Sequence, residues 1–198
     1  MTATLPLACS VTLGRVQLET ERLTLRPPEE ADLTELVEVF GDPEVMRYIA
    51  EGTPWTPAQT RTGFRRWQSS WSSDGFGMFV VTRREDGRIL GDTGMLAWDP
   101  RVWRPGSLRA IGPDAEIEIG WRFARHAWGN GYATEAALVV RDWARDEHGF
   151  DRLISLIHPD NAASIRVAEK IGSRYERDVQ LTGRMARIYV NGGHAPAR

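Results

Sequence analysis

Seven stretches of this chain have the hydrophobic and polar pattern of β-strands. The most regular is Glu116–Phe123, in which Ile117 and Ile119 alternate with Glu116 and Glu118. Such alternation places the isoleucines on one face of a strand and the carboxylates on the other. The remaining strands are expected over residues 18–26, 77–83, 89–98, 153–157, 173–179 and 184–190.

Apolar residues spaced three and four apart predict helices between these strands. They cover residues 29–40, 56–71, 133–144 and 161–171, with a short helix over 42–48. Thr56, Pro57 and Gln59 have the order of an N-cap, a first helical proline and a capping-box partner. Asn161 is expected to cap the last helix. Aromatic residues at helical spacing, such as Trp67 and Trp71, are expected in the core, and a role in lining a substrate site is the less favoured interpretation.

The turn between the Glu116–Phe123 strand and the helix after it contains Gly129 and Gly131. The first N–H groups of a helix lack intrahelical partners and attract anions, and glycine lets a phosphate approach the backbone. A phosphorylated ligand and a plain connecting loop are both consistent with this turn. The Walker and dinucleotide motifs are not matched, because Tyr132, Ala133 and Thr134 stand where those motifs need other residues.

Composition excludes several classes of function. The 198 residues carry 25 basic and 27 acidic side chains, well mixed, with a net charge of −2, so nucleic acid is not an expected partner. No apolar run approaches the roughly 20 residues that cross a membrane. Cys9 is the only cysteine, which rules out an internal disulfide and a cysteine-based zinc site and favours the cytoplasm. The four histidines do not have metal-ligand spacing, and no metal is expected.

The length fits one domain. We expect a flexible tail over residues 1–16, a single domain over 17–190 and a second flexible tail over 191–198. Residues 99–113, with three prolines and two glycines, are expected to form a long loop.

Two separated stretches resemble one known family when they are considered together. HAWGNGYATEA at 126–136 and HPDNAASIRVAEKIG at 158–172 resemble the cofactor loop and the following strand and helix of the GNAT N-acetyltransferases, in particular the RimJ/RimL-like branch. The opening ETERLTLRPPEEAD is also similar to that branch. The resemblance implies an α/β (α+β) fold: a splayed mixed sheet of about seven strands flanked by about four helices, with acetyl-CoA in the gap between the middle strands.

The resemblance also implies a set of site residues. Backbone groups of the strand end would bind the pantetheine arm, and amides of the following loop would hold the pyrophosphate. Asn161 would contact the cofactor or a water, and Ser164 would lie near the thioester sulfur. The residues expected at the cofactor are Trp121, Arg122, Phe123, His126, Ala127, Trp128, Gly129, Asn130, Gly131, Tyr132, Ala133, Asn161 and Ser164.

Two positions depart from the family pattern. His126 stands where the family loop often has Gln or Arg, so one side chain of the usual loop is replaced. Ala168 stands where many GNAT enzymes have the Tyr that protonates the leaving thiolate, as is usual in this branch, and Ser164 becomes the candidate acid. Glu118 and Glu116 share a strand face, so either could accept the amine proton. We favour Glu118, and expect Glu116 to pair with an arginine.

The resulting hypothesis is an acetyl-CoA-dependent N-acetyltransferase that transfers acetyl directly to a primary amine, either a protein N-terminus or a small molecule. Acceptor specificity is expected from residues 46–55 and from the 99–113 loop. The alternatives are an acyl-CoA-binding module without turnover and, more distantly, a nucleotide-binding domain. A homodimer is consistent with the resemblance alone.

Overall fold

The protein, described as a computed structural model over residues 16–181 and 183–193, folds around one mixed β-sheet. Its strand order is β1-β2-β3-β4-β6-β7-β9-β8, and β5 pairs with the end of β4. All neighbours are antiparallel except β6 and β7, which are parallel. The strands are β1 Leu18–Glu19, β2 Leu23–Arg26, β3 Met78–Arg83, β4 Ile89–Asp99, β5 Arg104–Gly106, β6 Glu116–Phe123, β7 Arg152–Ile157, β8 Arg174–Leu181 and β9 Arg184–Gly192.

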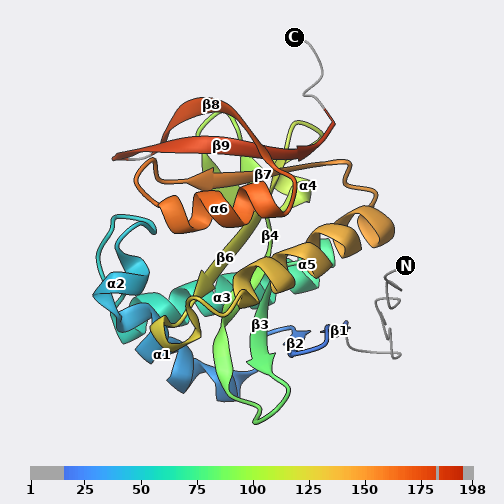
Figure 1. Cartoon of the computed structure of the whole chain (residues 1–198). Coiled ribbons are helices and arrows are strands. Elements are labelled where there is room, and N and C mark those ends of the chain that lie inside the picture. Colours follow the sequence, from blue (N-terminus) through green and yellow to red (C-terminus); the bar gives the residue numbers. More distant parts are fainter. Residues whose placement is uncertain (1–15, 182, 194–198) are drawn as a thin grey trace.

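Helices cover both faces of this sheet. They are α1 Leu33–Gly41, α2 Pro43–Met46, α3 Pro57–Asp74, α4 Leu108–Ile111, α5 Tyr132–His148 and α6 Ala162–Lys170, with 3₁₀ turns η1 Glu30–Asp32 and η2 Arg125–Ala127. In Figure 1 the strands β7, β8 and β9 lie at the top with α6 beneath them, and α5 crosses in front of the lower strands. No helix within the described ranges is both long and apolar enough to cross a membrane.

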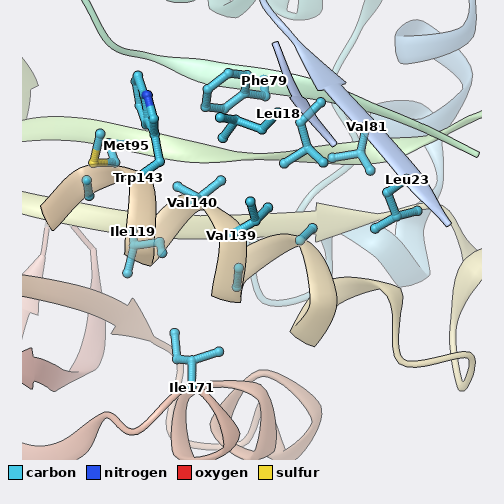
Figure 2. Packing of buried hydrophobic residues seen from close by; sticks show 14 of the residues in the cluster. Leu18, Leu23, Phe79, Val81, Met95, Ile119, Val139, Val140, Trp143 and Ile171 are labelled. Atoms are coloured by element: carbon cyan, nitrogen blue, oxygen red, sulfur yellow. The ribbon is translucent and has the colours of Figure 1, made fainter. Parts of the chain in front are cut away.

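Two hydrophobic clusters fix these layers. On one face, Val139, Val140 and Trp143 of α5 are buried against strand residues that include Met95 and Ile119 (Figure 2). On the other face, α1 and α3 are buried against β3 and β4 through a cluster that contains Phe40, Phe64, Trp67 and Val80. Because each face of the sheet is apolar where a helix covers it, the central strands β3 and β4 are buried on both sides.

The expected start of the third helix is confirmed in detail. The Thr56 hydroxyl accepts a hydrogen bond from the Gln59 amide at 3.3 Å, and the Gln59 side chain accepts one from the Thr56 amide at 2.8 Å. Both halves of the capping box are therefore present. Trp67 is buried and Trp71 packs edge-on against Phe79, so the expectation that these aromatic residues belong to the core is confirmed.

Residues 18–26 form two short strands instead of one. β1 and β2 pair with each other, Leu18 opposite Leu25, and the chain reverses between them. The Thr20 hydroxyl and backbone amide both bond to Leu23 in this reversal. The polar residues 19–22 separate Leu18 from Leu23, and the expectation of one strand extended across them.

The 99–113 segment is not the unstructured loop that we expected. Arg104–Gly106 forms β5 against β4, and Ser107 then caps the short helix α4 by accepting a hydrogen bond from the Ala110 amide. Pro105 and Gly106 lie within β5, whereas Pro100 follows β4 and Gly112 follows α4. Trp103 adopts a left-handed backbone angle of φ 50°. Two strands exceed the expected seven, because β5 is additional and residues 18–26 form both β1 and β2. Two short helices, α2 and α4, exceed the expected four.

The two expected tails lie mostly outside the described residues, as do Cys9 and His194. β9 runs to Gly192, two residues beyond the expected end of the last strand.

Candidate active site

The sheet opens between its two parallel strands. β6 and β7 have eight and six residues, yet they pair at a single position, Glu118 opposite Ile154. Beyond that position the strands separate, and the Ser155 hydroxyl bridges to the Ile119 carbonyl at 2.8 Å. The splay expected between the middle strands is therefore present.

Unpaired backbone groups of β6 face the opening. Alternate residues of a strand direct their N–H and C=O groups to the same side. The Ile119 carbonyl faces β7, as its bond from Ser155 shows, so the backbone groups of Trp121 and Phe123 face the same side. The Phe123 carbonyl accepts a 2.7 Å hydrogen bond from the Trp128 indole. Trp121 is left to offer its amide and carbonyl to a ligand in the gap.

The turn after β6 presents amides at the start of α5. Gly129 and Gly131 have φ of 78° and 81°, the left-handed region that favours glycine. Gly131 is the N-cap, and no side chain caps this helix. Within the described part of the chain, no acceptor bonds the amides from Gly129 to Thr134, whereas the Glu135 amide bonds the Gly131 carbonyl at 3.1 Å. This arrangement of free amides at a 17-residue helix suits a phosphate.

A cavity of about 480 Å³ lies in front of these amides. Three segments form its walls: α2 with the residues after it, the end of β6 with the turn that follows, and one side of α6. Eleven of the thirteen expected cofactor residues line it: Trp121, Arg122, Phe123, Ala127, Trp128, Gly129, Gly131, Tyr132, Ala133, Asn161 and Ser164. The other two, His126 and Asn130, are exposed on the outer side of the turn.

Glu118 lies on the opposite face of β6 from Trp121, at the position where the strands separate. Its Oε2 accepts a 2.6 Å hydrogen bond from the Trp98 indole. Desolvation by burial raises the pKa of Glu118 from 4.5 to about 7, although bonds from the Trp98 indole and the Leu156 amide act in the opposite direction. No basic side chain among the described residues pairs with Glu118, which leaves a carboxylate poised to exchange a proton near neutral pH.

Glu116, the alternative carboxylate, has a structural partner. Arg152 bonds Glu116 at 3.2 Å and Glu176 at 3.0 Å, so it bridges β6 and β8. The expectation that Glu116 pairs with an arginine is confirmed. Its ion pair leaves Glu118 as the carboxylate of this strand face that is free to accept a proton.

The Arg122 side chain points away from the splayed gap, although the residue borders the cavity. Its guanidinium is buried with Asp92 at 3.0 Å and lies 3.5 Å from the centre of the Phe40 ring. Burial raises the pKa of Asp92, and the charge of Arg122 opposes that rise. The pair thus anchors β4 and β6 to α1. The backbone N–H and C=O of Arg122 face β4, so Arg122 borders the cavity without directing a polar group into the gap.

Ser164 is fixed by two contacts. Its amide donates to the Asn161 side chain at 3.1 Å, so the expectation of Asn161 as N-cap is confirmed. Its hydroxyl oxygen lies 3.3 Å from the Trp121 indole nitrogen. An indole N–H can only donate, so the hydroxyl accepts this bond and its own hydrogen stays available.

Several contacts at the site were not expected from the sequence. Trp98 lies twenty positions before Glu118 and reaches it only because β4 pairs with β6. Arg47 and Tyr48, which line the α2 wall, lie in the 46–55 segment where acceptor specificity was expected, but their anchor was not foreseen: Arg184 donates to the Tyr48 carbonyl at 2.6 Å. Arg166 and Lys170 line the cavity one turn apart on α6, three and seven residues after Ala163, which lines it as well.

No three His, Cys, Asp or Glu side chains gather into a metal-binding group in the described ranges.

Comparison with known proteins identifies the family. The family model "Acetyltransferase (GNAT) domain" matches residues 22–174. The uncharacterized protein YkkB of Bacillus subtilis is 33% identical over 177 residues, which cover 89% of this chain and 95% of that protein. The uncharacterized N-acetyltransferase p20 of Bacillus licheniformis is 28% identical over 178 residues, which cover 87% and 93%. The crystal structure of an acetyltransferase from Agrobacterium tumefaciens superimposes with a TM-score of 0.73 at 28% identity, covering 96% of this chain and 100% of that one.

The chain belongs to the GNAT acetyltransferase family. It is an acetyl-CoA-dependent acetyltransferase, with acetyl-CoA as cosubstrate.

Proposed function

We propose that this acetyltransferase transfers acetyl directly to a primary amine, with Glu118 as the base and Ser164 as the acid. The proposal places it in the RimJ/RimL-like branch, because Asn161 and Ser164 match that branch and Ala168 replaces the tyrosine of other GNAT enzymes. The observation that carries it is the place of the Glu118 carboxylate, which lies where β6 and β7 separate and accepts the Trp98 indole hydrogen. Burial raises its pKa to about 7, which suits a base.

The proposed cosubstrate path runs along the edge of β6. The free amides from Gly129 to Ala133 support binding of the pyrophosphate. The pantetheine arm would pass the backbone of Trp121, whose orientation toward the gap supports that contact. The acetyl group would then reach the position where β6 and β7 separate.

The proposed acetyl transfer requires three contributions from the protein. Glu118 takes the proton of the amine as its nitrogen forms the new C–N bond. Backbone N–H groups of β6 stabilise the negative charge that develops on the carbonyl oxygen. Ser164 gives its hydroxyl proton to the sulfur as the C–S bond breaks, and the Trp121 bond supports this role because it leaves that proton free.

Gly120 supports an acceptor position beside Glu118. A Cβ built at Gly120 meets nothing nearer than the Glu118 carboxyl group at 3.9 Å, and its φ lies outside the left-handed region, so neither packing nor backbone conformation requires glycine there. The absence of a side chain leaves room next to the base. This room suits a primary amine, which both a protein N-terminus and many small molecules carry.

Thiol release from acetyl-CoA, measured against a panel of N-terminal peptides, amino acids, polyamines and aminoglycosides, tests the proposal. Release with at least one amine is the expected result, and the best amine names the acceptor class. Saturable binding of acetyl-CoA without release for any amine would favour the alternative of a binding module without turnover.

A further inference from the structure

A carboxylate lies beside the proposed phosphate site. Glu135 lies in the first turn of α5, next to the free amides. A negative charge there interacts favourably with the helix dipole, but it also repels a phosphate that binds the same helix end. The site therefore needs a means of neutralising Glu135.

Arg22 supplies the opposite charge from a segment 113 residues away in the sequence. Its Nε and Nη2 donate to Glu135 Oε2 at 2.7 and 2.5 Å. The Thr20 hydroxyl and the Arg22 amide donate to the other carboxylate oxygen, at 2.5 and 3.2 Å. Both oxygens of Glu135 are thus occupied by the β1–β2 turn.

The same guanidinium also holds the glycine turn. Arg22 Nη1 donates to the Asn130 carbonyl at 3.1 Å, and the Arg22 guanidinium lies 4.6 Å from the centre of the Tyr132 ring. In a trans peptide the C=O and the following N–H point in opposite directions. The Gly131 amide is therefore turned away from Arg22, and Gly131 lines the cavity while Asn130 does not.

We propose that Arg22 is a positioning residue of the pyrophosphate site. It neutralises Glu135 and sets the Asn130–Gly131 peptide, so that the loop amides face the pyrophosphate of acetyl-CoA before it binds. This inference rests on the proposed assignment of the loop as the pyrophosphate site.

Binding of coenzyme A, dephospho-coenzyme A and pantetheine, measured by calorimetry, separates the phosphate groups. In Arg22→Met we expect affinity for both coenzyme forms to fall about tenfold, because Glu135 then repels the pyrophosphate. Pantetheine, which has no phosphate, should bind as it does to the wild type. Adding Glu135→Gln to Arg22→Met should restore most of the lost affinity.

Two further variants complete the design. Arg84→Met removes an arginine that bonds the Thr20 carbonyl in the same turn without contacting Glu135, and it should leave coenzyme A affinity unchanged. Arg22→Lys keeps the charge beside Glu135 but cannot span both Glu135 and Asn130, so it should fold and lose a smaller share of the affinity.

Several outcomes would overturn the inference. The first is a coenzyme A affinity that does not change in Arg22→Met, and the second is an equal loss of pantetheine affinity in that variant. The third is no recovery of affinity when Glu135→Gln is added, because that result would mean that Arg22 contacts the ligand itself. A wild type that binds coenzyme A while these variants contradict the inference leaves the proposed function standing. If the wild type binds no coenzyme A, both fail together.

Discussion

Trp98 donates its indole hydrogen to Glu118 across two paired strands, with 2.6 Å between Nε1 and Oε2. The bond stabilises the charged form of a carboxylate that burial would otherwise keep protonated. Trp98 therefore lowers the pKa of Glu118 against the effect of burial, and so increases the charged fraction of this carboxylate near neutral pH.

Replacing Trp98 with Phe should raise the pKa of Glu118 above about 7. A base works when deprotonated, so the acidic limb of kcat/KM should move to higher pH, by roughly one unit for the loss of one hydrogen bond. The pH profile with the best amine measures this shift. Trp71→Phe is the matched control, because it loses an indole bond that goes to the Met78 carbonyl and not to Glu118. An unmoved limb would show that Glu118 is not the titrating base.

Glu118→Gln should lower kcat about 100-fold or more and leave acetyl-CoA affinity unchanged. Steady-state kinetics and calorimetry measure the two effects. Glu116→Gln is the control from the same strand face, because Glu116 bonds Arg152, and its kcat should stay near that of the wild type. Equal loss of turnover in both variants would contradict the choice between the two carboxylates.

Glu118→Gln should also change stability in a pH-dependent way. Because the folded pKa of Glu118 is raised to about 7, its presence favours folding most below its unfolded pKa and less as pH rises through 7. The melting temperature of Glu118→Gln should therefore rise relative to that of the wild type as the pH increases from 5 to 8. A constant difference across that range would contradict a raised pKa.

Ser164→Ala should lower kcat, and Trp121→Phe should lower it less, because the indole acts on the reaction through the Ser164 hydroxyl. In the double variant the Trp121 change should add little to the Ser164 change. Fully additive losses in kcat would mean that the indole acts independently of the hydroxyl. Affinity for coenzyme A, measured alongside, separates lost packing in the cavity from lost proton transfer.

His148 should make stability fall in acid. Its ring is packed among Phe76, Trp143 and Phe150, and its Nε2 is buried without a hydrogen-bond partner in the described structure. Burial lowers the pKa of His148 below 6.5, so the unfolded chain takes up the proton first and stability is lost as pH falls from about 6.5. His148→Phe should flatten the melting temperature between pH 7 and pH 5. A slope equal to that of the wild type would show that His148 does not contribute to it.

Several elements followed from local sequence because their causes are local. The capping box at Thr56, the N-cap at Asn161 and the strand alternation in β6 each depend on residues within one or two turns or on one strand. The turn at Gly129 and Gly131 was likewise visible, since only glycine adopts its backbone angles readily. The motifs then indicated the family that the comparison confirmed.

The tertiary structure decided which side chains meet. Trp98 meets Glu118, Arg22 meets Glu135 and Trp121 meets Ser164 through strand pairing and helix packing between segments far apart in the chain. It also placed Glu116 and Glu118, which share a strand face, in different surroundings: Glu116 bonds Arg152, whereas burial raises the pKa of Glu118. The sequence by itself determined the local elements and the family, because capping and periodicity act between near neighbours. The charge and orientation of each site residue depend on distant partners and on burial, which only the folded chain brings together.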